Sequence, residues 1–148
     1  MTKETPHHFD TTLLREYDIR GVIGSTLGPD DARAIGLGFG TLVRRAGGQR
    51  VAVGYDGRLS SPMLCDALVA GLAATGCEAI VIGEGATPML YFATHHLSAD
   101  GGIQITGSHN PPDYNGFKFV MGGAPFFGAD IQRVGALAAA ADWEIGAG

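Results

Sequence analysis

The chain has 148 residues, enough for one domain of ordinary size. With 45% hydrophobic and 17% charged residues, it is neither a disordered tail nor a coiled coil. The net charge is −5, and no basic stretch of the kind that binds nucleic acid is present. No run reaches the roughly 18 apolar residues of a membrane span, and the two cysteines have no CxxC spacing. These features predict a soluble, reduced, cytoplasmic protein that binds neither nucleic acid nor membrane.

The first half of the chain alternates between helical and strand patterns. After Asp30, apolar residues recur at three- and four-residue spacing, which predicts a helix that ends before Gly47. The apolar run at residues 50–54 predicts a buried strand. A second helix follows, and the side chain of either Ser60 or Ser61 can cap its first turn.

The second half repeats this alternation. Strands are predicted at residues 78–83, 102–106 and 117–121, and helices at residues 87–97 and 130–141. Between the last two strands, residues 107–116 are rich in turn formers, and Asn115-Gly116 predicts the point at which the chain turns back. The alternation predicts a layered α/β/α domain with a mixed, mostly parallel sheet covered by helices on both faces. Ligands of such folds bind at the carboxyl ends of the strands.

The segment ITGSHNPPDYNGFK, residues 105–118, carries the most polar chemistry in the chain. Ser108 directly follows a predicted strand, and a loop that folds back would bring the Lys118 ammonium near its hydroxyl. A serine, a histidine (His109) and a lysine around one loop suit phosphoryl or acyl transfer. Acyl transfer is disfavoured, because the G-x-S-x-G elbow is missing and Ser108 and His109 are sequence neighbours. On the pattern alone, a proline-rich connecting loop with a capping serine is an equal alternative.

The same segment resembles the active-site serine loop of the α-D-phosphohexomutases, above all the bacterial phosphomannomutase/phosphoglucomutase branch. Two further stretches agree: FDTTLLREYDIRG at residues 9–21 resembles the N-terminal YDIRG signature, and VGYDGRLSS at residues 53–61 resembles the GxDxR-x-S stretch. The three motifs stand in the order of the family, and the resemblance extends over residues 9–135.

The resemblance implies a role for five residues. Ser108 would be the phosphoserine that carries the transferred phosphoryl group, Lys118 a general acid/base, and His109 a supporting polar or proton-transfer group. Tyr17 and Arg20 would face the same cleft and bind substrate or phosphate. The phosphate on Ser108 would also contribute a ligand to Mg²⁺, and glucose 1,6-bisphosphate would act as an activator.

Other conspicuous side chains receive structural interpretations. Asp56 and Arg58 follow a predicted strand, and we interpret them as a pair that orders a loop rather than as catalytic groups. Cys65 and Cys77 are expected to be small core residues.

The resemblance covers only the first part of the family's pattern. The Asp-rich metal loop, the sugar-recognising loop and the distal phosphate loop of these multidomain mutases have no counterpart in this sequence. Residues 9–148 are therefore expected to be the N-terminal, serine-bearing domain, after a disordered tail at residues 1–8. The parent enzyme would interconvert hexose 1-phosphate and hexose 6-phosphate, with hexose phosphates and the remaining domains as partners, and the fragment alone would be inactive. The alternative is a stand-alone phosphosugar-binding or regulatory module without turnover.

Overall fold

The structure is a computed structural model that describes residues 5–107, 110–122 and 124–146. Its strands are β1 (Ile19–Val22), β2 (Arg50–Tyr55), β3 (Glu78–Glu84), β4 (Gly101–Ile105), β5 (Tyr114–Met121) and β6 (Ala124–Pro125). Its helices are α1 (Pro29–Arg45), α2 (Ser61–Ala74), α3 (Thr87–His96) and α4 (Ala129–Ala140). None of the helices in these ranges is both long and apolar enough to cross a membrane.

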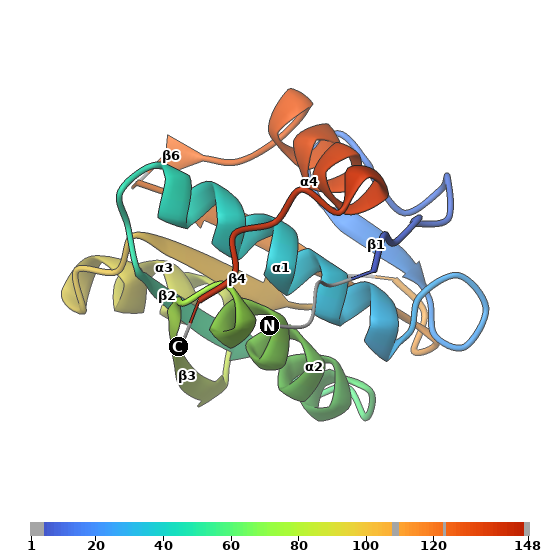
Figure 1. The fold of residues 1–148 in the computed structure, drawn as a ribbon. Coiled ribbons are helices and arrows are strands. Elements are labelled where there is room, and N and C mark those ends of the chain that lie inside the picture. Colours follow the sequence, from blue (N-terminus) through green and yellow to red (C-terminus); the bar gives the residue numbers. More distant parts are fainter. Residues whose placement is uncertain (1–4, 108–109, 123, 147–148) are drawn as a thin grey trace.

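One mixed sheet forms the middle layer, in the order β1-β5-β4-β2-β3, with β6 added to β5 (Figure 1). Parallel pairing joins β2 to β3 and to β4, whereas β5 runs antiparallel to β1, β4 and β6. The predicted α/β fold with a mixed sheet is therefore confirmed. Parallel pairing is confined to β2, β3 and β4.

Helices α1, α2 and α4 cover one face of the sheet (Figure 1). Glycines allow α1 and α2 to cross closely: a Cβ on Gly36 would lie 2.3 Å from the Leu68 carbonyl oxygen, and one on Gly71 2.1 Å from that of Arg33. Beneath α1, the Phe39 ring is fully buried and lies 5.3 Å from the Phe119 ring, centroid to centroid. This face therefore holds the main hydrophobic core.

The opposite face is covered by α3 over β2 and β4. Leu90 of α3 is fully buried. Thr94 of the same helix packs closely on Gly102 of β4, since a Cβ on Gly102 would lie 2.4 Å from the Thr94 methyl carbon. Lys118 and Val120 of β5 lie beyond this helix and line an open pocket. The part of this face formed by β5 is thus left uncovered by α3.

The predicted turn at Asn115-Gly116 is wrong, because both residues lie inside β5. A Cβ on Gly116 would meet the Ile19 carbonyl oxygen at 2.4 Å, so glycine is needed there to let β1 approach β5. The chain reverses earlier, at a turn in which the Tyr114 amide donates to the Pro111 carbonyl (3.0 Å). The residue pair that favours a turn in sequence instead serves strand packing.

The predicted side-chain cap of α2 is also wrong. Ser60 occupies the cap position in a helical conformation, and its side chain makes no capping hydrogen bond. A backbone hydrogen bond satisfies the first amide of the helix instead, since the Ser61 amide donates to the Arg58 carbonyl (3.1 Å). This frees both serine hydroxyls for contacts with other loops.

Near the N-terminus, His7 contacts two helices. Its amide donates to the Ala138 carbonyl of α4 (2.9 Å), and its ring lies 2.8 Å from the Asp31 carboxylate of α1. The ring also packs edge-on against Phe9. His7 belongs to the stretch expected to be a disordered tail, of which residues 1–4 lie outside the described residues.

Candidate active site

The loops after β2, β3 and β4 meet at one edge of the sheet, as their parallel direction requires. The Asp56 amide, just past β2, donates to the Ile105 carbonyl at the end of β4 (2.9 Å). The Gly85 amide, just past β3, donates to the Tyr55 carbonyl (2.8 Å). The connection between β4 and β5, residues 106–113, which we call the serine loop, leaves β4 at this edge. Ser108 and His109 themselves lie outside the described residues.

The Arg58 side chain binds the backbone of the serine loop. Its Nη1 donates to the carbonyls of Pro111 (2.6 Å) and Tyr114 (3.1 Å), and its Nη2 to that of Asn110 (2.8 Å). Its Nε lies 3.3 Å from the Asp56 carboxylate. These contacts confirm the interpretation of Asp56 and Arg58 as a pair that orders a loop.

The Asp56 carboxylate accepts hydrogen bonds from the loop after β2, from the first residue of α2 and from the start of the serine loop. Its Oδ1 accepts from Ser61 Oγ (2.7 Å) and from the Arg58 amide (3.1 Å), and its Oδ2 from the Gly107 amide (3.0 Å). Burial raises the pKa of Asp56, but these hydrogen bonds outweigh it and hold the pKa below the ordinary value of 3.8. The carboxylate is therefore charged at neutral pH.

Asn115, which the sequence predicted to lie in a turn, is a functional candidate. It is fully buried, and its Nδ2 donates to the hydroxyls of Ser60 (2.9 Å) and Ser61 (3.0 Å). Its Oδ1 accepts from the Gly116 amide (2.9 Å). Since Ser61 also binds Asp56, one polar network connects the start of α2 to both ends of the serine loop. Composition alone could not reveal it, because Asn-Gly is an equally good turn signal.

Arg20 and Lys118 lie on the open side of the sheet, on neighbouring strands. The register places Arg20 opposite Gly116 and Lys118 two residues further along β5 on the same face. Arg20 Nη2 lies 2.5 Å from the Asp18 carboxylate, and both side chains are largely buried. Its Nε is buried and has no hydrogen-bond partner among the described residues. The structure thus places these two predicted site residues on the same face of the sheet.

A pocket of about 990 Å³ opens on this face beside β5. Tyr17 is 73% exposed and stacks on Phe127 with a centroid distance of 5.8 Å. The pocket brings Tyr17 and Lys118 together, whereas Arg20 is not among the lining residues. These are Tyr17, Tyr91, Thr94, His95, Ser98, Ala99, Gly101, Lys118, Phe119, Val120, Ala124, Phe126 and Phe127. The surface combines aromatic rings with one cationic side chain, Lys118, as in small-molecule sites that are lined by apolar groups and a few polar ones.

The described residues contain no group of three or more His, Cys, Asp or Glu side chains that could hold a metal ion. Mg²⁺ prefers several oxygen ligands.

The motifs and the fold agree with one protein family. The family model described as phosphoglucomutase/phosphomannomutase, alpha/beta/alpha domain I, matches residues 11–144. The chain belongs to this family. The resemblance of its three sequence motifs is thereby confirmed.

Curated relatives from the phosphoglucomutase/phosphomannomutase family are longer than this chain. A phosphomannomutase/phosphoglucomutase from Pseudomonas putida is 43% identical over 134 residues, which are 90% of this chain and 29% of the relative. One from Pseudomonas aeruginosa is 46% identical over 123 residues, covering 83% of this chain and 27% of the relative. The chain thus spans less than a third of these relatives.

Solved structures of the family have the same fold. A phosphoglucomutase/phosphomannomutase family protein from Burkholderia thailandensis superimposes with a TM-score of 0.90 at 45% identity, over 95% of this chain and 32% of that structure. The structure of a phosphomannomutase, described as putative, from Thermus thermophilus gives a TM-score of 0.78 at 31% identity, over 90% of this chain and 30% of its own. The layered fold of this chain is therefore that of the family's first domain.

Proposed function

We propose that this chain is the serine-bearing N-terminal domain of a cytoplasmic phosphohexomutase that interconverts hexose 1-phosphates and hexose 6-phosphates of mannose and glucose. One observation carries the proposal. A loop with the family's serine motif leaves β4 next to the face that holds Arg20 and Lys118, and the partly buried Arg58 and Asp56 side chains tie its backbone to the loop after β2.

The proposed reaction moves a phosphoryl group between Ser108 and the sugar. The bond between Ser108 Oγ and phosphorus breaks, a bond from phosphorus to a free sugar hydroxyl oxygen forms, and that hydroxyl gives up its proton. The product is a bisphosphorylated sugar and a serine that takes up a proton. Transfer of the other phosphoryl group back to Ser108 reverses these steps and leaves the isomeric monophosphate.

Four other residues would support this exchange. Lys118 would move the proton at the sugar hydroxyl as general acid/base, and His109 would assist as a polar or proton-transfer group. Arg20 would stabilise phosphoryl charge, and its buried Nε without a partner among the described residues supports such a ligand. Tyr17 would present its exposed ring to the sugar.

Mg²⁺ and glucose 1,6-bisphosphate belong to the proposal as cofactor and activator. The phosphate on Ser108 would supply one magnesium ligand, and the ion would neutralise phosphoryl charge when bound. Its other ligands would come from outside the described residues, which contain no metal-binding cluster. The bisphosphate would restore phosphoserine after loss of the phosphoryl group.

The 148-residue chain by itself is expected to be inactive as a mutase. It spans 29% of the Pseudomonas putida relative, and transition-state stabilisation needs all contacts to the substrate in one closed site. We expect it to bind glucose 1-phosphate weakly. Robust turnover or tight sugar-phosphate binding by the 148 residues would instead favour a stand-alone module.

The test is Ser108→Ala in the complete protein that carries this chain. After incubation with glucose 1,6-bisphosphate, intact-mass measurement should find one phosphoryl group on the wild type and none on the variant. A coupled assay should find mutase turnover abolished. Ser25→Ala, at an exposed turn, is the matched control and should behave as wild type. Turnover by Ser108→Ala within a few-fold of wild type would refute the proposal.

A further inference from the structure

We propose that Arg58 and Asp56 are positioning residues for Ser108, which set the loop conformation in which phosphoryl transfer occurs. The inference rests on the proposed function, since it assigns Ser108 the transferred group. It goes beyond a loop-ordering contact because it predicts a catalytic effect through Ser108, without contact between Arg58 and substrate.

The first argument is where the contacts fall along the loop. Gly107, the residue before Ser108, donates its amide to Asp56 Oδ2 (3.0 Å). The carbonyls of Asn110 and Pro111, which follow residues 108–109 in the chain, accept from the two terminal nitrogens of Arg58 (2.8 and 2.6 Å). The residues on either side of positions 108–109 are thus hydrogen-bonded to one ion pair, and a shift of that pair would displace these flanking residues.

The second argument is the close fit of the guanidinium against the loop. A Cβ on Gly107 would lie 2.1 Å from Arg58 Cζ and 2.1 Å from Nε, so the guanidinium packs directly against the backbone of Gly107. The Arg58 side chain is only 17% exposed and that of Asp56 24%. Hydrogen bonds in which the donor or the acceptor is ionised are stronger than those between neutral groups.

The third argument is the choice of acceptors. Arg58 donates to three loop carbonyls, the third being that of Tyr114 (3.1 Å) at the start of β5. The guanidinium is a planar fork with five donors that can serve several acceptors at once in a fixed geometry, which the lysine ammonium does not reproduce. The Arg58 charge also faces the Asp56 carboxylate at 3.3 Å. Its interactions are therefore directed at the loop backbone.

A fourth observation connects the pair to the body of the domain. The Asp56 carboxylate accepts from Ser61 Oγ (2.7 Å), and Ser61 Oγ in turn accepts from the buried Asn115 amide (3.0 Å). Ser61 is the first residue of α2, and Asn115 belongs to β5. The pair therefore transmits the position of two rigid elements to the loop, which is what a positioning role requires.

The consequence is an effect on the chemical step. Misplacement of a reacting group by about 1 Å can cost on the order of 10²-fold in rate. Arg58 has no place in substrate binding under this proposal, so kcat should fall while KM for the hexose phosphate stays close to wild type.

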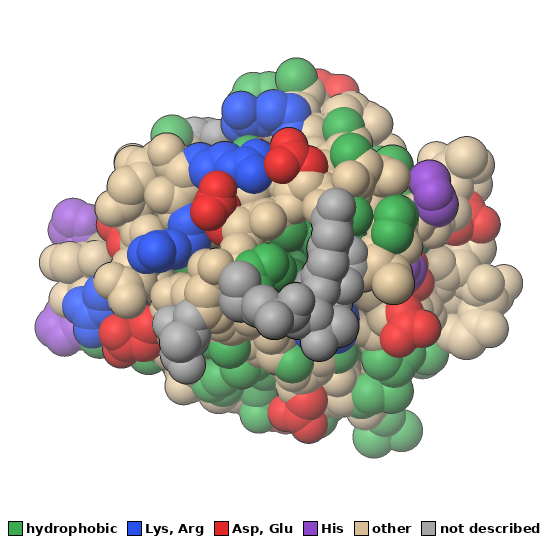
Figure 2. Space-filling model, viewed as in Figure 1, with side chains coloured by type: hydrophobic (Ala, Val, Ile, Leu, Met, Phe, Trp, Pro, Cys, Tyr) green, Lys and Arg blue, Asp and Glu red, His purple; other side chains and the backbone are tan. Residues whose placement is uncertain are grey.

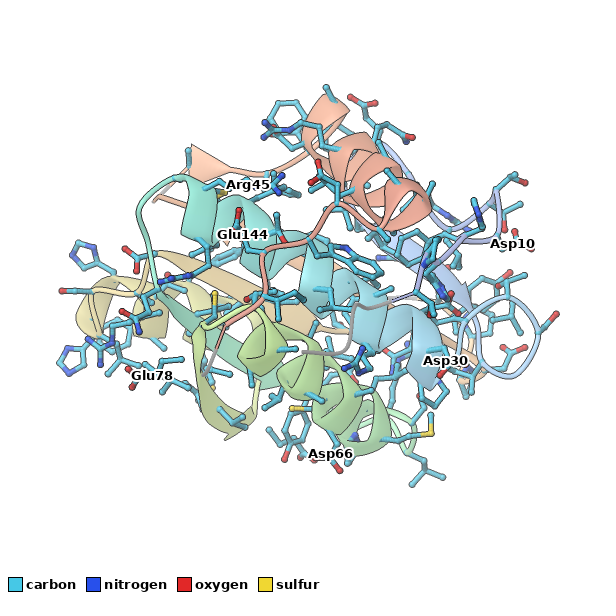
Figure 3. The ribbon with its side chains drawn as sticks, in the orientation of Figure 1. Asp10, Asp30, Arg45, Asp66, Glu78 and Glu144 are labelled. Atoms are coloured by element: carbon cyan, nitrogen blue, oxygen red, sulfur yellow. The ribbon has the colours of Figure 1, made fainter. Side chains whose placement is uncertain are left out.

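The experiment compares Arg58→Gln and Arg58→Lys with Arg45→Gln in the complete protein. Arg45 is a matched control, because its side chain also pairs with carboxylates, those of Asp142 (2.9 Å) and Glu144 (3.0 Å). Figure 3 shows Arg45 and Glu144 close together between the end of α1 and the C-terminal segment. Steady-state kinetics gives kcat and KM, and amide hydrogen exchange reports loop order at Asn110 and Tyr114.

For Arg58→Gln we expect kcat to fall about 10- to 100-fold, with KM near wild type. Exchange at Asn110 and Tyr114 should become faster, while amides of β2 and β3 keep their protection. Arg58→Lys should recover only part of kcat, because it restores the charge without the fork. Arg45→Gln should change none of these readouts.

Two results would overturn the inference while leaving the proposed function intact. One is unchanged kcat in Arg58→Gln while Ser108→Ala is inactive. The other is equal loss of protection in the loop and in β2 and β3, for both Arg58 variants, which would mean general unfolding. Active Ser108→Ala would instead refute the proposed function, whatever the Arg58 variants do.

Discussion

The two faces of the sheet differ in what covers them and in what they carry. On the face under α1, α2 and α4, buried apolar side chains pack against one another, with Phe39 and Phe119 in contact at the centre. On the face that α3 half covers, Lys118 and the exposed Tyr17 line an open pocket. The main apolar core thus lies on one side of the sheet, and the pocket with Lys118 on the other.

The outer surface of the covered side also differs from the open pocket. Over α4 and the end of α1, acidic and basic side chains alternate (Figure 2), as in the ion pairs of Arg45 with Asp142 and of Arg133 with Asp130. Such exposed pairs contribute little to stability. The difference teaches that charge alone does not mark the site, and that burial and backbone acceptors distinguish Arg58 from Arg45.

The largest expected effect is the loss of stability caused by a substitution in the core under α1. Phe39→Ala removes a fully buried ring that lies 5.3 Å from Phe119 and 5.2 Å from Phe126. We expect a loss of about 3–5 kcal/mol in the free energy of unfolding, measured by chemical denaturation. Phe127→Ala, 45% exposed beside the pocket, should cost about 0.5 kcal/mol or less. Equal losses would show that the faces do not differ in stability.

Lys118→Met sharpens the comparison from the other side. Methionine keeps much of the apolar stem and removes the charge, so the free energy of unfolding should stay near wild type. Mutase turnover of the complete protein should fall about 10²–10⁴-fold, as expected for loss of a general acid/base. Arg133→Met, at an exposed position on α4, is the control for charge removal. An unfolded Lys118→Met variant would make Lys118 structural, and normal kinetics would make it a bystander.

The sequence was sufficient for the alternation of strands and helices, because buried apolar runs and helical periodicity are local signals. It did not reveal β1 as a strand, since the pairing of Ile19 with Phe117 joins residues far apart in the chain. Asn115-Gly116 misled for the same reason. Gly116 is required because the Ile19 carbonyl lies so close to it, and Asn115 donates to the hydroxyls of Ser60 and Ser61 before and at the start of α2.

The candidate site was predictable in part. Motifs named Ser108, Lys118, His109, Tyr17 and Arg20, and the register brings Arg20 and Lys118 onto one face; Ser108 and His109 lie outside the described residues. The pairing of Asp56 with Arg58 could be anticipated from their spacing. Their backbone partners could not, because carbonyl acceptors carry no sequence signature.

The smallest expected effect concerns acid. The folded-state pKa of Asp56 lies below its ordinary 3.8, because hydrogen bonds from Ser61, Arg58 and Gly107 outweigh the effect of burial. A depressed carboxyl pKa contributes stability that is complete above the ordinary value and is lost as pH falls through the folded value. Protection of the Asn110 amide should therefore decline below about pH 4, before the fold unfolds.

Asp56→Asn isolates this contribution. The amide keeps an acceptor but loses the charge, so at neutral pH the variant should lose about 1–3 kcal/mol of stability and should show faster exchange at Asn110. Its loop exchange should then lack the additional acid step of the wild type, after correction for intrinsic exchange rates. Asp100 provides the comparison at the other end of β2, where amides of Arg50 and Gln49 lower the pKa of its carboxyl. Asp100→Asn should leave the acid-dependent step in exchange of the serine loop intact. If that step disappeared in Asp100→Asn, acid would act on the whole sheet rather than on the Asp56–Arg58 pair.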